Sequence, residues 1–379
     1  MLKKYRIIIL CIVIITFCFL KCENNKKISK MKTKSSPSIS KDFFGTINKN
    51  DSVQIFTLKN SKNISVKVLS YGGVIKEINI PDRKGAYKNI VLDYDKIGSY
   101  NTDQSYLGAI IGRYANRIQN GKFKIDNSIY SLAKNNNENH LHGGLVGFDK
   151  VIWIAKTDIK DNSASLILKY FSRDMEEGYP GNLKVSVIYT LTNDNELDIE
   201  YSANTDKKTI INLTNHSYFN LTGEKENIDS HLLKINSKEY IPVDSNLIPI
   251  GQFENVANTP FDFNQYKPIG KEINATNNQL SIGNGYDHCW VLNKKYNEYG
   301  FSASLYDKIS GRLLEIYSDQ PGIQVYSGNY LSDPFIKRQG ICLETQHYPD
   351  SPNQKNYPST LLNPNEEYYS KTSFKFMVE

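Results

Sequence analysis

The sequence predicts an all-β protein that forms a single large antiparallel β-sandwich. Apolar and polar residues alternate in many segments between residues 43 and 379, as in strands that bury one face. No window of about ten residues shows a convincing helical period, and no change in composition divides this stretch. Strands with one buried face favour antiparallel sheets over a parallel βαβ sheet. No repeat of about 20–50 residues is found, which disfavours a propeller.

The clearest strand patterns lie in four places. Every second residue is apolar in LKVSVIYTL (183–191) and again in ELDIEYSA (196–203). The turn-forming residues TNDN (192–195) separate the two segments, so together they predict a β-hairpin. NISVKVLSYGGVIKEINIPD (63–82) predicts two strands that bend at Gly72 and Gly73. SASLILKYFS (163–172) and GRLLEIYSD (311–319) predict further strands.

The first 22 residues have the pattern of an export signal. Basic residues at positions 3, 4 and 6 precede an apolar run over residues 7–20, which is too short for the ~20 residues of a membrane-spanning helix. A short uncleaved anchor is the alternative. Cys22 follows, as in bacterial lipoproteins whose first mature residue is lipidated, although Lys21 stands where those sites usually carry a small residue. Lipidation with a membrane tether through Cys22 and simple secretion are equal alternatives.

The positive charge of the chain belongs to this leader and to the segment that follows it. Residues 23–42 are rich in Lys, Ser and Asn without an apolar period, which predicts a flexible tether before a single domain at 43–379. Residues 1–41 hold ten Lys or Arg and one acidic residue, which leaves 36 basic and 39 acidic residues in the body. The body is therefore net −3, which disfavours nucleic acid as a partner. We expect an exported protein, either in the periplasm or cell envelope or secreted.

Cysteine is scarce in the predicted domain. Three of the five cysteines lie in the first 22 residues, and only Cys289 and Cys342 remain. Two cysteines make neither a disulfide framework nor a metal cluster. They either pair with each other or are two isolated buried thiols.

Five short polar segments interrupt the strand patterns: GRYANRI (112–118), HLHGG (140–144), NHSYF (215–219), GYDH (285–288) and CLETQ (342–346). His140 and His142 are two residues apart, so on a strand they would face the same way and could ligate a metal. Leu145, Val146 and Gly147 stand where a cupin-like barrel would need a glutamate, which disfavours that site.

Charged residues in these segments leave two interpretations open. Glu344 follows an apolar stretch, so it is either paired for structure or positioned as a general base. Arg113 and Arg117 either hold carboxylates of the fold or offer donors to an oxygen-rich ligand. Asp287 either accepts from ligand hydroxyls or forms a local turn.

Seven segments together resemble the aldose 1-epimerase, or galactose mutarotase, family. They are GRYANRI, LHGGLVGFDK, EEGYPG, NLTNHSYFNL, GYDH, QPGIQVYSGN and CLETQHYPDSPN. One such motif would be weak evidence, but seven in order, from about residue 43 to the end, are specific. The resemblance implies a galactose mutarotase-like supersandwich and an isomerase that interconverts the α and β anomers of free hexoses. It implies a monosaccharide as the partner, no cofactor and no metal.

The resemblance also implies roles for eight residues. The general acid of the family matches His216, the expected proton donor, and its general base matches Glu344, the expected proton acceptor. The positions that bind sugar hydroxyls or the ring oxygen match Asn116, Arg117, His142, Tyr218, Asp287 and Gln324. Each of these positions carries the residue that the family has there. The leader and tether are the departure, and they concern location rather than chemistry.

Three other functions fit parts of the pattern. A hexose-6-phosphate 1-epimerase would need additional cationic groups for the phosphate. A glycoside hydrolase would need a second carboxylate beside Glu344, for which Asp287 is the candidate. A non-catalytic sugar-binding module would use the abundant tyrosines for stacking, and would need neither His216 nor Glu344.

Overall fold

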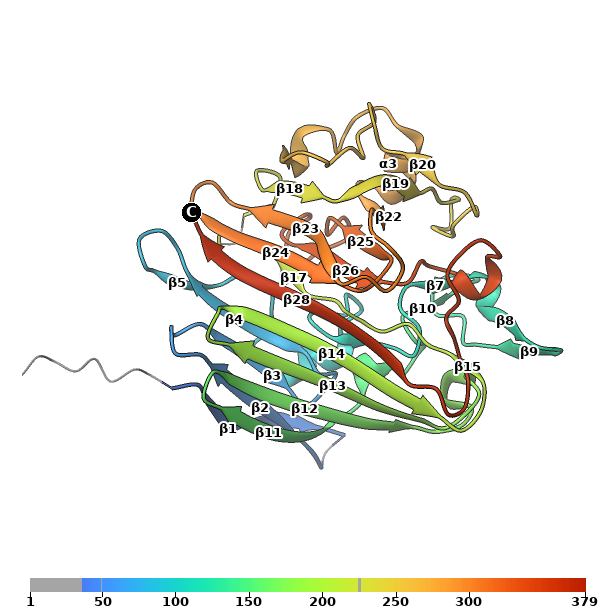
Figure 1. The fold of residues 1–379 in the computed structure, drawn as a ribbon, viewed down its shortest axis with the longest axis horizontal. Helices are drawn as coiled ribbons and strands as arrows, with labels where there is room; N and C mark the ends of the chain where they lie inside the picture. The colour runs from blue at the N-terminus through green and yellow to red at the C-terminus, as the bar shows by residue number, and fades with distance from the viewer. Residues whose placement is uncertain (1–35, 49, 224–225) are drawn as a thin grey trace, which may run out of the picture. The chain divides into compact units, whose positions relative to one another are not determined.

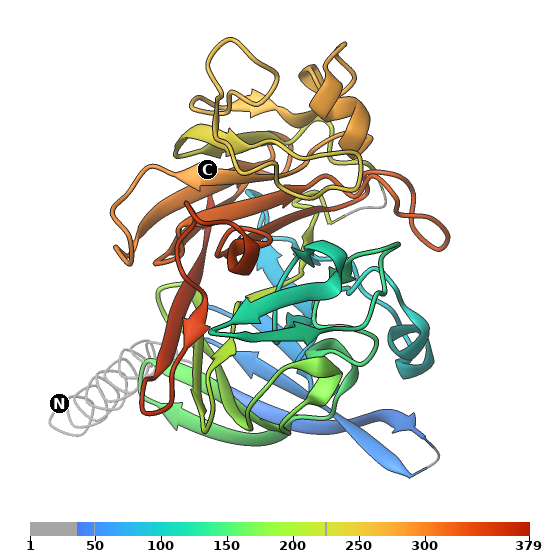
Figure 2. The ribbon, with the colours of Figure 1, turned by 90° about the vertical axis from the view of Figure 1, so that its right-hand side faces the viewer.

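The computed structural model describes residues 36–48, 50–223 and 226–379, so the predicted export signal and most of the tether lie outside the described residues. Residues 36–379 form one compact unit built from three main sheets and several short strand pairs (Figures 1 and 2). Each strand pair of the three main sheets is antiparallel, as the sequence predicts. Among the described residues, no helix is long and apolar enough to cross a membrane.

The largest sheet has nine strands in the order β11-β12-β13-β14-β28-β24-β23-β18-β21. Its strands are β11 (Ile154–Lys160), β12 (Ser163–Ser172), β13 (Leu183–Thr192), β14 (Glu196–Thr205), β18 (Leu232–Ile235), β21 (Lys267–Pro268), β23 (Gly300–Tyr306), β24 (Arg312–Ser318) and β28 (Tyr368–Val378). The predicted hairpin is confirmed, because β13 pairs with β14 from Leu183↔Thr205 to Leu191↔Leu197.

Two smaller sheets lie behind this one, in the orders β1-β2-β3-β4-β5 and β17-β26-β25-β22-β19-β20 (Figure 1). The first contains β1 (Ser38–Ile47), β2 (Asp51–Lys59), β3 (Ser65–Leu69), β4 (Ile75–Pro81) and β5 (Tyr87–Asn89). The second contains β17 (Tyr218–Phe219), β19 (Ser237–Ile241), β20 (Glu254–Asn255), β22 (Asp287–Leu292), β25 (Gly322–Tyr326) and β26 (Ile341–Gln346).

Short elements complete the described part of the chain. The strand pairs are β6 (Ile110–Ile111) with β16 (Thr214–Asn215), β7 (Arg117–Ile118) with β10 (His140–Leu141), β8 (Lys122–Ile125) with β9 (Ser128–Ser131) and β15 (Thr209–Ile210) with β27 (Leu361–Leu362). The α-helices are α2 (Ile97–Thr102) and α3 (Asn278–Gly283). The 3₁₀ turns are η1 (Gln119–Gly121), η2 (Phe148–Lys150), η3 (Glu176–Gly178), η4 (Ile269–Lys271) and η5 (Ser351–Asn353).

The predicted bend at Gly72 and Gly73 is the turn between β3 and β4. Both glycines have positive φ, at 63° and 55°, where residues with a side chain are strained. A Cβ atom on Gly73 would lie 2.2 Å from Cδ1 of Ile110, and one on Gly72 would lie 2.5 Å from the carbonyl oxygen of Asp149. Glycine is therefore required here both by backbone conformation and by close packing against β6 and η2.

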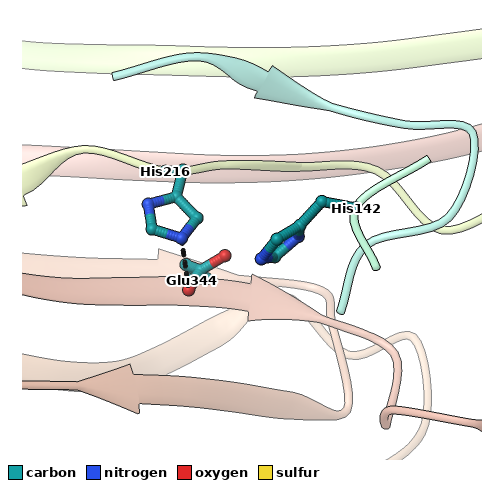
Figure 3. A group of neighbouring side chains, drawn as sticks. All are labelled: His142, His216 and Glu344. Carbon is teal, nitrogen blue, oxygen red and sulfur yellow. Dashed lines mark ion pairs between the residues drawn. The ribbon is translucent and has the colours of Figure 1, made fainter. Parts of the chain in front are cut away.

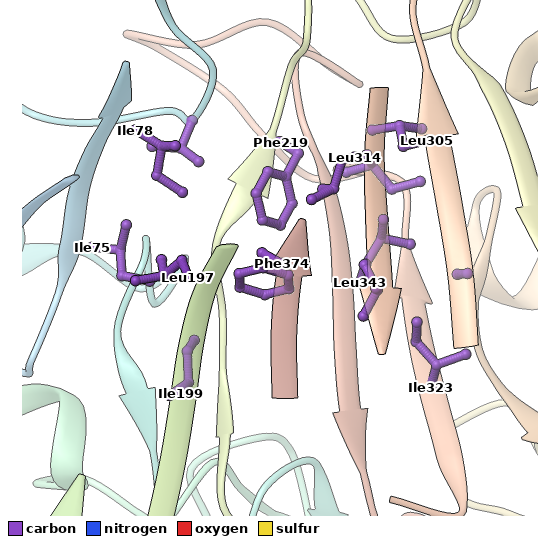
Figure 4. Close-up of a cluster of buried hydrophobic side chains, with 14 of the residues drawn as sticks. Ile75, Ile78, Leu197, Ile199, Phe219, Leu305, Leu314, Ile323, Leu343 and Phe374 are labelled. Carbon is purple, nitrogen blue, oxygen red and sulfur yellow. The ribbon is translucent and has the colours of Figure 1, made fainter. Parts of the chain in front are cut away.

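The hydrophobic core fills the space between the nine-stranded sheet and the two smaller sheets (Figure 4). Phe219 of β17 packs edge to face on Phe374 of β28, with ring centroids 5.2 Å apart. Ile75 of β4 and Leu343 of β26 belong to the same cluster, so one core joins all three sheets. Full burial of each such side chain stabilises the fold by roughly 1.5–3 kcal/mol. The core fixes β17 and β26, which carry much of the site.

The predicted boundary between tether and domain at residues 42/43 is wrong. Strand β1 already begins at Ser38 and pairs with β2 from Ser38↔Lys59 onward. Most of its side chains are exposed or half-buried, because β1 is an edge strand held by main-chain hydrogen bonds. Such a strand shows no apolar period, which is why the sequence pattern suggested a tether.

Candidate active site

A cavity of about 590 Å³ opens where the short pairs β6/β16 and β7/β10 meet the six-stranded sheet. It gathers residues that are far apart in the sequence. The residues that line it are Gln104, Ser105, Tyr106, Asn116, Arg117, Asn136, Asn137, Leu141, His142, His216, Tyr218, Ser245, Asn246, Leu247, Ile282, Asp287, Tyr326, Tyr330, Leu331, Ser332 and Glu344. Seven of the eight expected site residues are among them, and the eighth, Gln324, lines a small adjoining cavity with Asp287.

His216 and Glu344 both line this cavity, and their side chains point toward each other (Figure 3). His216 lies between β16 and β17, whose pairings with β6 and β26 hold the segment on both sides. Glu344 projects from the middle of β26. The Nε2 atom of His216 lies 3.7 Å from Oε1 of Glu344, and their side chains are only 5% and 2% exposed. The two groups are close enough to exchange protons with one small ligand that contacts both of them.

Burial shifts the acidity of both groups toward their uncharged forms. It lowers the pKa of His216 to about 4. It raises the pKa of Glu344 well above its usual value, and the nearby Asp287 adds to this effect. Arg117 opposes the shift, because its positive charge stabilises the carboxylate. A cleft that holds an acid and a base with strongly perturbed pKa values is a candidate for proton-transfer chemistry.

The carboxyl group of Glu344 is incompletely satisfied by the protein. Its Oε2 atom is buried and has no hydrogen-bond partner among the described residues. The Oε1 atom of Gln324, on the neighbouring strand β25, is also without one. Buried polar atoms in native proteins normally have a hydrogen-bond partner. Two buried oxygens without one therefore indicate a ligand or ordered water.

The tautomer of His142 is fixed by a main-chain hydrogen bond. Its Nδ1 atom accepts a hydrogen bond of 3.2 Å from the main-chain N–H of Asn116. The proton of the neutral ring must therefore sit on Nε2. Burial lowers the pKa of His142 well below the usual value, and the nearby His216 and Arg117 act in the same direction. The Nε2–H group of His142 is thus a neutral donor in the lining of the cavity.

His140 does not share this site, so the expectation that the two histidines face the same way is wrong. Strand β10 ends at Leu141, and His142 has a positive φ of 50°, which turns its side chain away from the strand alternation. The His140 ring instead donates from Nδ1 to the carbonyl oxygen of Ala133 at 2.8 Å, and its Nε2 accepts from the hydroxyl of Tyr179 at 2.6 Å. His140 is a satisfied core residue.

A metal ion could in principle be held by His142, His216 and Glu344. One ligand atom of each lies within 4.8 Å of the others. The hydrogen bond from Asn116 to Nδ1 of His142 opposes this, because it leaves the proton on Nε2 and makes that atom a donor. The donor set fits a sugar hydroxyl better than a metal.

The two arginines of GRYANRI have different environments. Arg113 is buried and donates to Oγ of Ser172 and to the main-chain oxygens of Ser172, Arg173 and Pro180. It is therefore a structural clamp. Arg117 lines the cavity, and its Nε donates to Oδ1 of Asn136 at 3.1 Å.

The remaining expected residues are held by neighbours. Asp287 begins β22, and its Oδ1 accepts a hydrogen bond of 2.7 Å from Nε2 of Gln324. Gln324 therefore orients the carboxylate of Asp287 through this hydrogen bond. Tyr218 lies in β17 with its hydroxyl donating to the carbonyl oxygen of Ser105, and its ring centroid is 5.1 Å from that of His216. Asn116 has a positive φ of 62°, a conformation that Asn tolerates.

Sequence reasoning missed Tyr106. Its ring centroid lies 4.6 Å from that of His142 and 5.9 Å from that of His216. Its φ is 57°, which is unusual for a bulky residue and indicates a conformation imposed by the surrounding structure. The only available signal was its place six residues before GRYANRI. The loop residues 245–247 and 330–332 carried no signal at all.

The two cysteines of the body are buried and free, which decides between the two interpretations of the sequence. Cys342 lies near the site, with Sγ 3.5 Å from Nδ1 of His216. Cys289 contacts the carbonyl oxygen of Trp290.

Comparison with known proteins gives concordant results. The sequence profile of the family described as Aldose 1-epimerase matches residues 54–375. Galactose mutarotase from Homo sapiens is 41% identical over 351 residues, which cover 90% of this chain and 99% of that protein. Aldose 1-epimerase from Escherichia coli (strain K12) is 36% identical over 335 residues, which cover 86% of this chain and 96% of that protein.

Solved structures show the same likeness. Galactose 1-epimerase from Lactobacillus acidophilus NCFM superposes with a TM-score of 0.82 at 30% identity, covering 90% of this chain and 99% of that one. An aldose epimerase homologue from C. elegans superposes with a TM-score of 0.78 at 26% identity, covering 89% of this chain and 99% of that one.

Proposed function

This chain belongs to the aldose 1-epimerase family, and from that premise we propose that His216 and Glu344 are the acid-base pair with which it interconverts the α and β anomers of hexoses such as galactose. The protein is an isomerase. The observation that carries the proposal is the 3.7 Å approach of Nε2 of His216 to Oε1 of Glu344, with the second carboxyl oxygen left unpaired in the cavity.

The reaction opens and closes a cyclic hemiacetal. The carboxylate of Glu344 takes the proton of the C1 hydroxyl while the protonated His216 gives a proton to the ring oxygen. The bond between C1 and the ring oxygen breaks, and the C1 oxygen becomes an aldehyde. Rotation about C1–C2 presents the other face, and both proton transfers reverse as the ring closes. Each positioned acid or base contributes roughly 10²–10⁴-fold to the rate.

The pair carries one exchangeable proton in both halves of this cycle. Because burial disfavours both charges, it favours the uncharged pair with the proton on Glu344. That uncharged pair is the distribution reached after ring opening, when the site is ready for closure. A cyclic sugar needs the proton on His216 instead, and Arg117 favours this transfer because it lowers the pKa of Glu344.

The remaining residues are proposed to hold the sugar. The Nε2–H group of His142 and the guanidinium of Arg117 donate to sugar oxygens, and Asp287 accepts from hydroxyls. Gln324 supports the site by orienting Asp287. This hydrogen bond keeps the carboxylate of Asp287 in a fixed direction. Orientation matters because a misplacement of about 1 Å can lower the reaction rate about 10²-fold.

Neutral hexoses are proposed as substrates in preference to hexose 6-phosphates. Among the described residues that line the cavity, Arg117 alone carries a permanent positive charge, and it already serves Glu344 and Asp287. A phosphate group would need further cations. Turnover of galactose, glucose and glucose 6-phosphate should be compared, and a preference for the phosphate would contradict the proposal.

Polarimetry of freshly dissolved α-galactose tests the proposed activity directly. The purified protein should speed the approach to the equilibrium rotation in proportion to its concentration. Treatment with a strong chelator should leave this rate unchanged, because no Lewis acid takes part. Binding of galactose without any acceleration would instead indicate a sugar-binding module. Release of monosaccharide from an aryl glycoside would indicate a glycoside hydrolase.

We also propose that residues 1–22 direct export and that Cys22 is lipidated, on the sequence pattern alone. Labelling of expressing bacteria with radioactive palmitate should mark the protein, and Cys22→Ser should abolish the label. An unlabelled protein outside the cytoplasm would indicate simple secretion, and a protein retained inside would contradict export. A chain beginning at Ser36 should keep normal turnover, because Gln104 is the first residue that lines the cavity in the described part of the chain.

A further inference from the structure

Tyr106 contacts both histidines of the site from a backbone conformation that its residue type disfavours. Its ring centroid lies 4.6 Å from that of His142 and 5.9 Å from that of His216. Its φ of 57° lies in the left-handed region, which glycine and asparagine tolerate but a bulky residue does not adopt without strain. A strained residue persists only where the surrounding structure imposes its conformation, and such residues cluster at functional sites.

The loop that carries Tyr106 is held by hydrogen bonds on both sides of that residue. The carboxylate of Asp103 accepts from the main-chain N–H groups of Ser105 and Leu107, at 2.9 and 3.0 Å. The Nζ atom of Lys150 donates to the carbonyl oxygen of Asp103 at 2.7 Å. These bonds hold the residues before and after Tyr106, so they fix the direction in which its ring points.

We propose that Tyr106 is a positioning residue for the epimerase reaction, whose ring keeps the imidazoles of His142 and His216 in their working orientation and keeps water away from His216. The inference rests on the roles proposed above for these two histidines. Burial and the charge of Asp149 raise the pKa of Tyr106 well above its usual value. The hydroxyl of Tyr106 therefore stays protonated and takes no part in the proton exchange.

Exclusion of water matters for the acidity of His216. Burial lowers the pKa of His216 to about 4, while a hydrogen bond with the main chain of the same residue and the charge of Asp103 act in the opposite direction. The ring of Tyr106 supplies part of this burial. The titratable side chains that face His216 are Tyr106, His142, Tyr218, Cys342 and Glu344. A substitution of Tyr106 alone keeps the other four, so a rise in the pKa of His216 would report water admitted beside it.

Two substitutions at Tyr106 separate its ring from its hydroxyl. Tyr106→Phe keeps the ring, so kcat and KM for galactose should stay near those of the unsubstituted protein. Tyr106→Asn removes the ring, and the loop should still fold because asparagine tolerates the positive φ. Both histidines then lose their orientation, so kcat should fall, KM should rise and kcat/KM should drop about 10–10²-fold, on the scale of a misplacement of about 1 Å. Polarimetry on equal amounts of folded protein measures these constants.

Tyr130→Asn is the matched control. Tyr130 is a half-buried tyrosine of β9 that stacks on another aromatic ring, and it lies outside the lining of the cavity. Its substitution should leave both constants unchanged. Loss of kcat/KM in this control equal to the loss in Tyr106→Asn would overturn the proposal, because any lost tyrosine ring would then have the same effect.

NMR titration of His216 between about pH 5 and pH 8 supplies a readout that does not depend on activity, with the signal assigned by its absence in His216→Asn. His216 should stay uncharged over this range in the unsubstituted protein and in Tyr106→Phe. In Tyr106→Asn it should begin to protonate, because its pKa rises toward the usual 6.5. A His216 that stays uncharged in folded Tyr106→Asn would overturn the proposal, as would equal kcat/KM in the two Tyr106 variants. Polarimetry of the unsubstituted protein shows separately whether the proposed function fails.

Discussion

Two arginines and two histidines from the same two segments, 112–118 and 140–144, differ in which groups satisfy their hydrogen-bonding atoms. Arg113 and His140 have their donors and acceptors matched by protein groups, mostly main-chain oxygens. Arg117 and His142 line the cavity, and the Nε2–H of His142 has no protein acceptor assigned to it among the described residues. The unmatched hydrogen-bonding groups, rather than the residue types, therefore mark the site.

The acid-base pair includes a buried carboxyl oxygen of Glu344 without a partner among the described residues. Substitution of this pair should have the largest effect on turnover. Glu344→Gln keeps the shape of the side chain but cannot accept the C1 proton. His216→Asn keeps a donor but cannot deliver a proton to the ring oxygen. Each change should lower turnover by at least ~10²-fold, on the scale of general acid-base groups, with little change in sugar affinity. Polarimetry measures turnover, and thermal melts should show folded proteins.

The arginines should separate stability from activity. Arg113→Gln leaves several buried carbonyl oxygens without a donor, so the free energy of unfolding should fall by about 2–4 kcal/mol while turnover per folded molecule stays normal. Arg117→Gln should keep the stability and lower kcat/KM about tenfold or more, because the charge that favours ionised Glu344 is lost. Urea denaturation and polarimetry measure the two effects, and similar profiles for both variants would contradict the comparison.

Substitutions of His142 and His140 should also separate activity from stability, with smaller effects than those of the arginines. His142→Leu removes a donor to the sugar, so KM should rise about tenfold, the value of one hydrogen bond of about 1.4 kcal/mol. His140→Asn should leave KM unaltered and lower the melting temperature, because the hydroxyl of Tyr179 loses its acceptor. An altered KM in His140→Asn would show that the two histidines are not independent.

Acid should destabilise the protein through His140. Burial lowers the pKa of His140 from about 6.5 to about 4, so between these values the unfolded chain binds a proton that the folded chain does not. Stability from this group is complete above pH 6.5 and is lost as the pH falls toward 4, by up to about 1.4 kcal/mol per pH unit. His140→Asn should remove this part of the dependence. Urea denaturation of both proteins at pH 7 and pH 5 checks the difference.

The sequence predicted most of the fold, because strand alternation and turn residues are local signals. The hairpin of β13 and β14 and the turn at Gly72 and Gly73 follow from them. Strand β1 escaped prediction because main-chain pairing, not side-chain burial, holds an edge strand.

The site was partly predictable for a different reason. The motifs named the residues that line the cavity, but the residues alone did not distinguish His140 from His142 or Arg113 from Arg117. Those distinctions depend on the positive φ of His142 and on carbonyl oxygens of distant segments. Tyr106 was missed because its contacts with the two histidines exist only in three dimensions.

The central claim is that His216 and Glu344 act as one unit that shares a single proton. The double variant of His216→Asn and Glu344→Gln tests it most directly, by polarimetry with folding checked for each protein. Groups that act in one step are non-additive, so the double variant should lose no more than about tenfold beyond the worse single variant. A loss equal to the product of the two single losses would show that the groups act independently and would contradict the account.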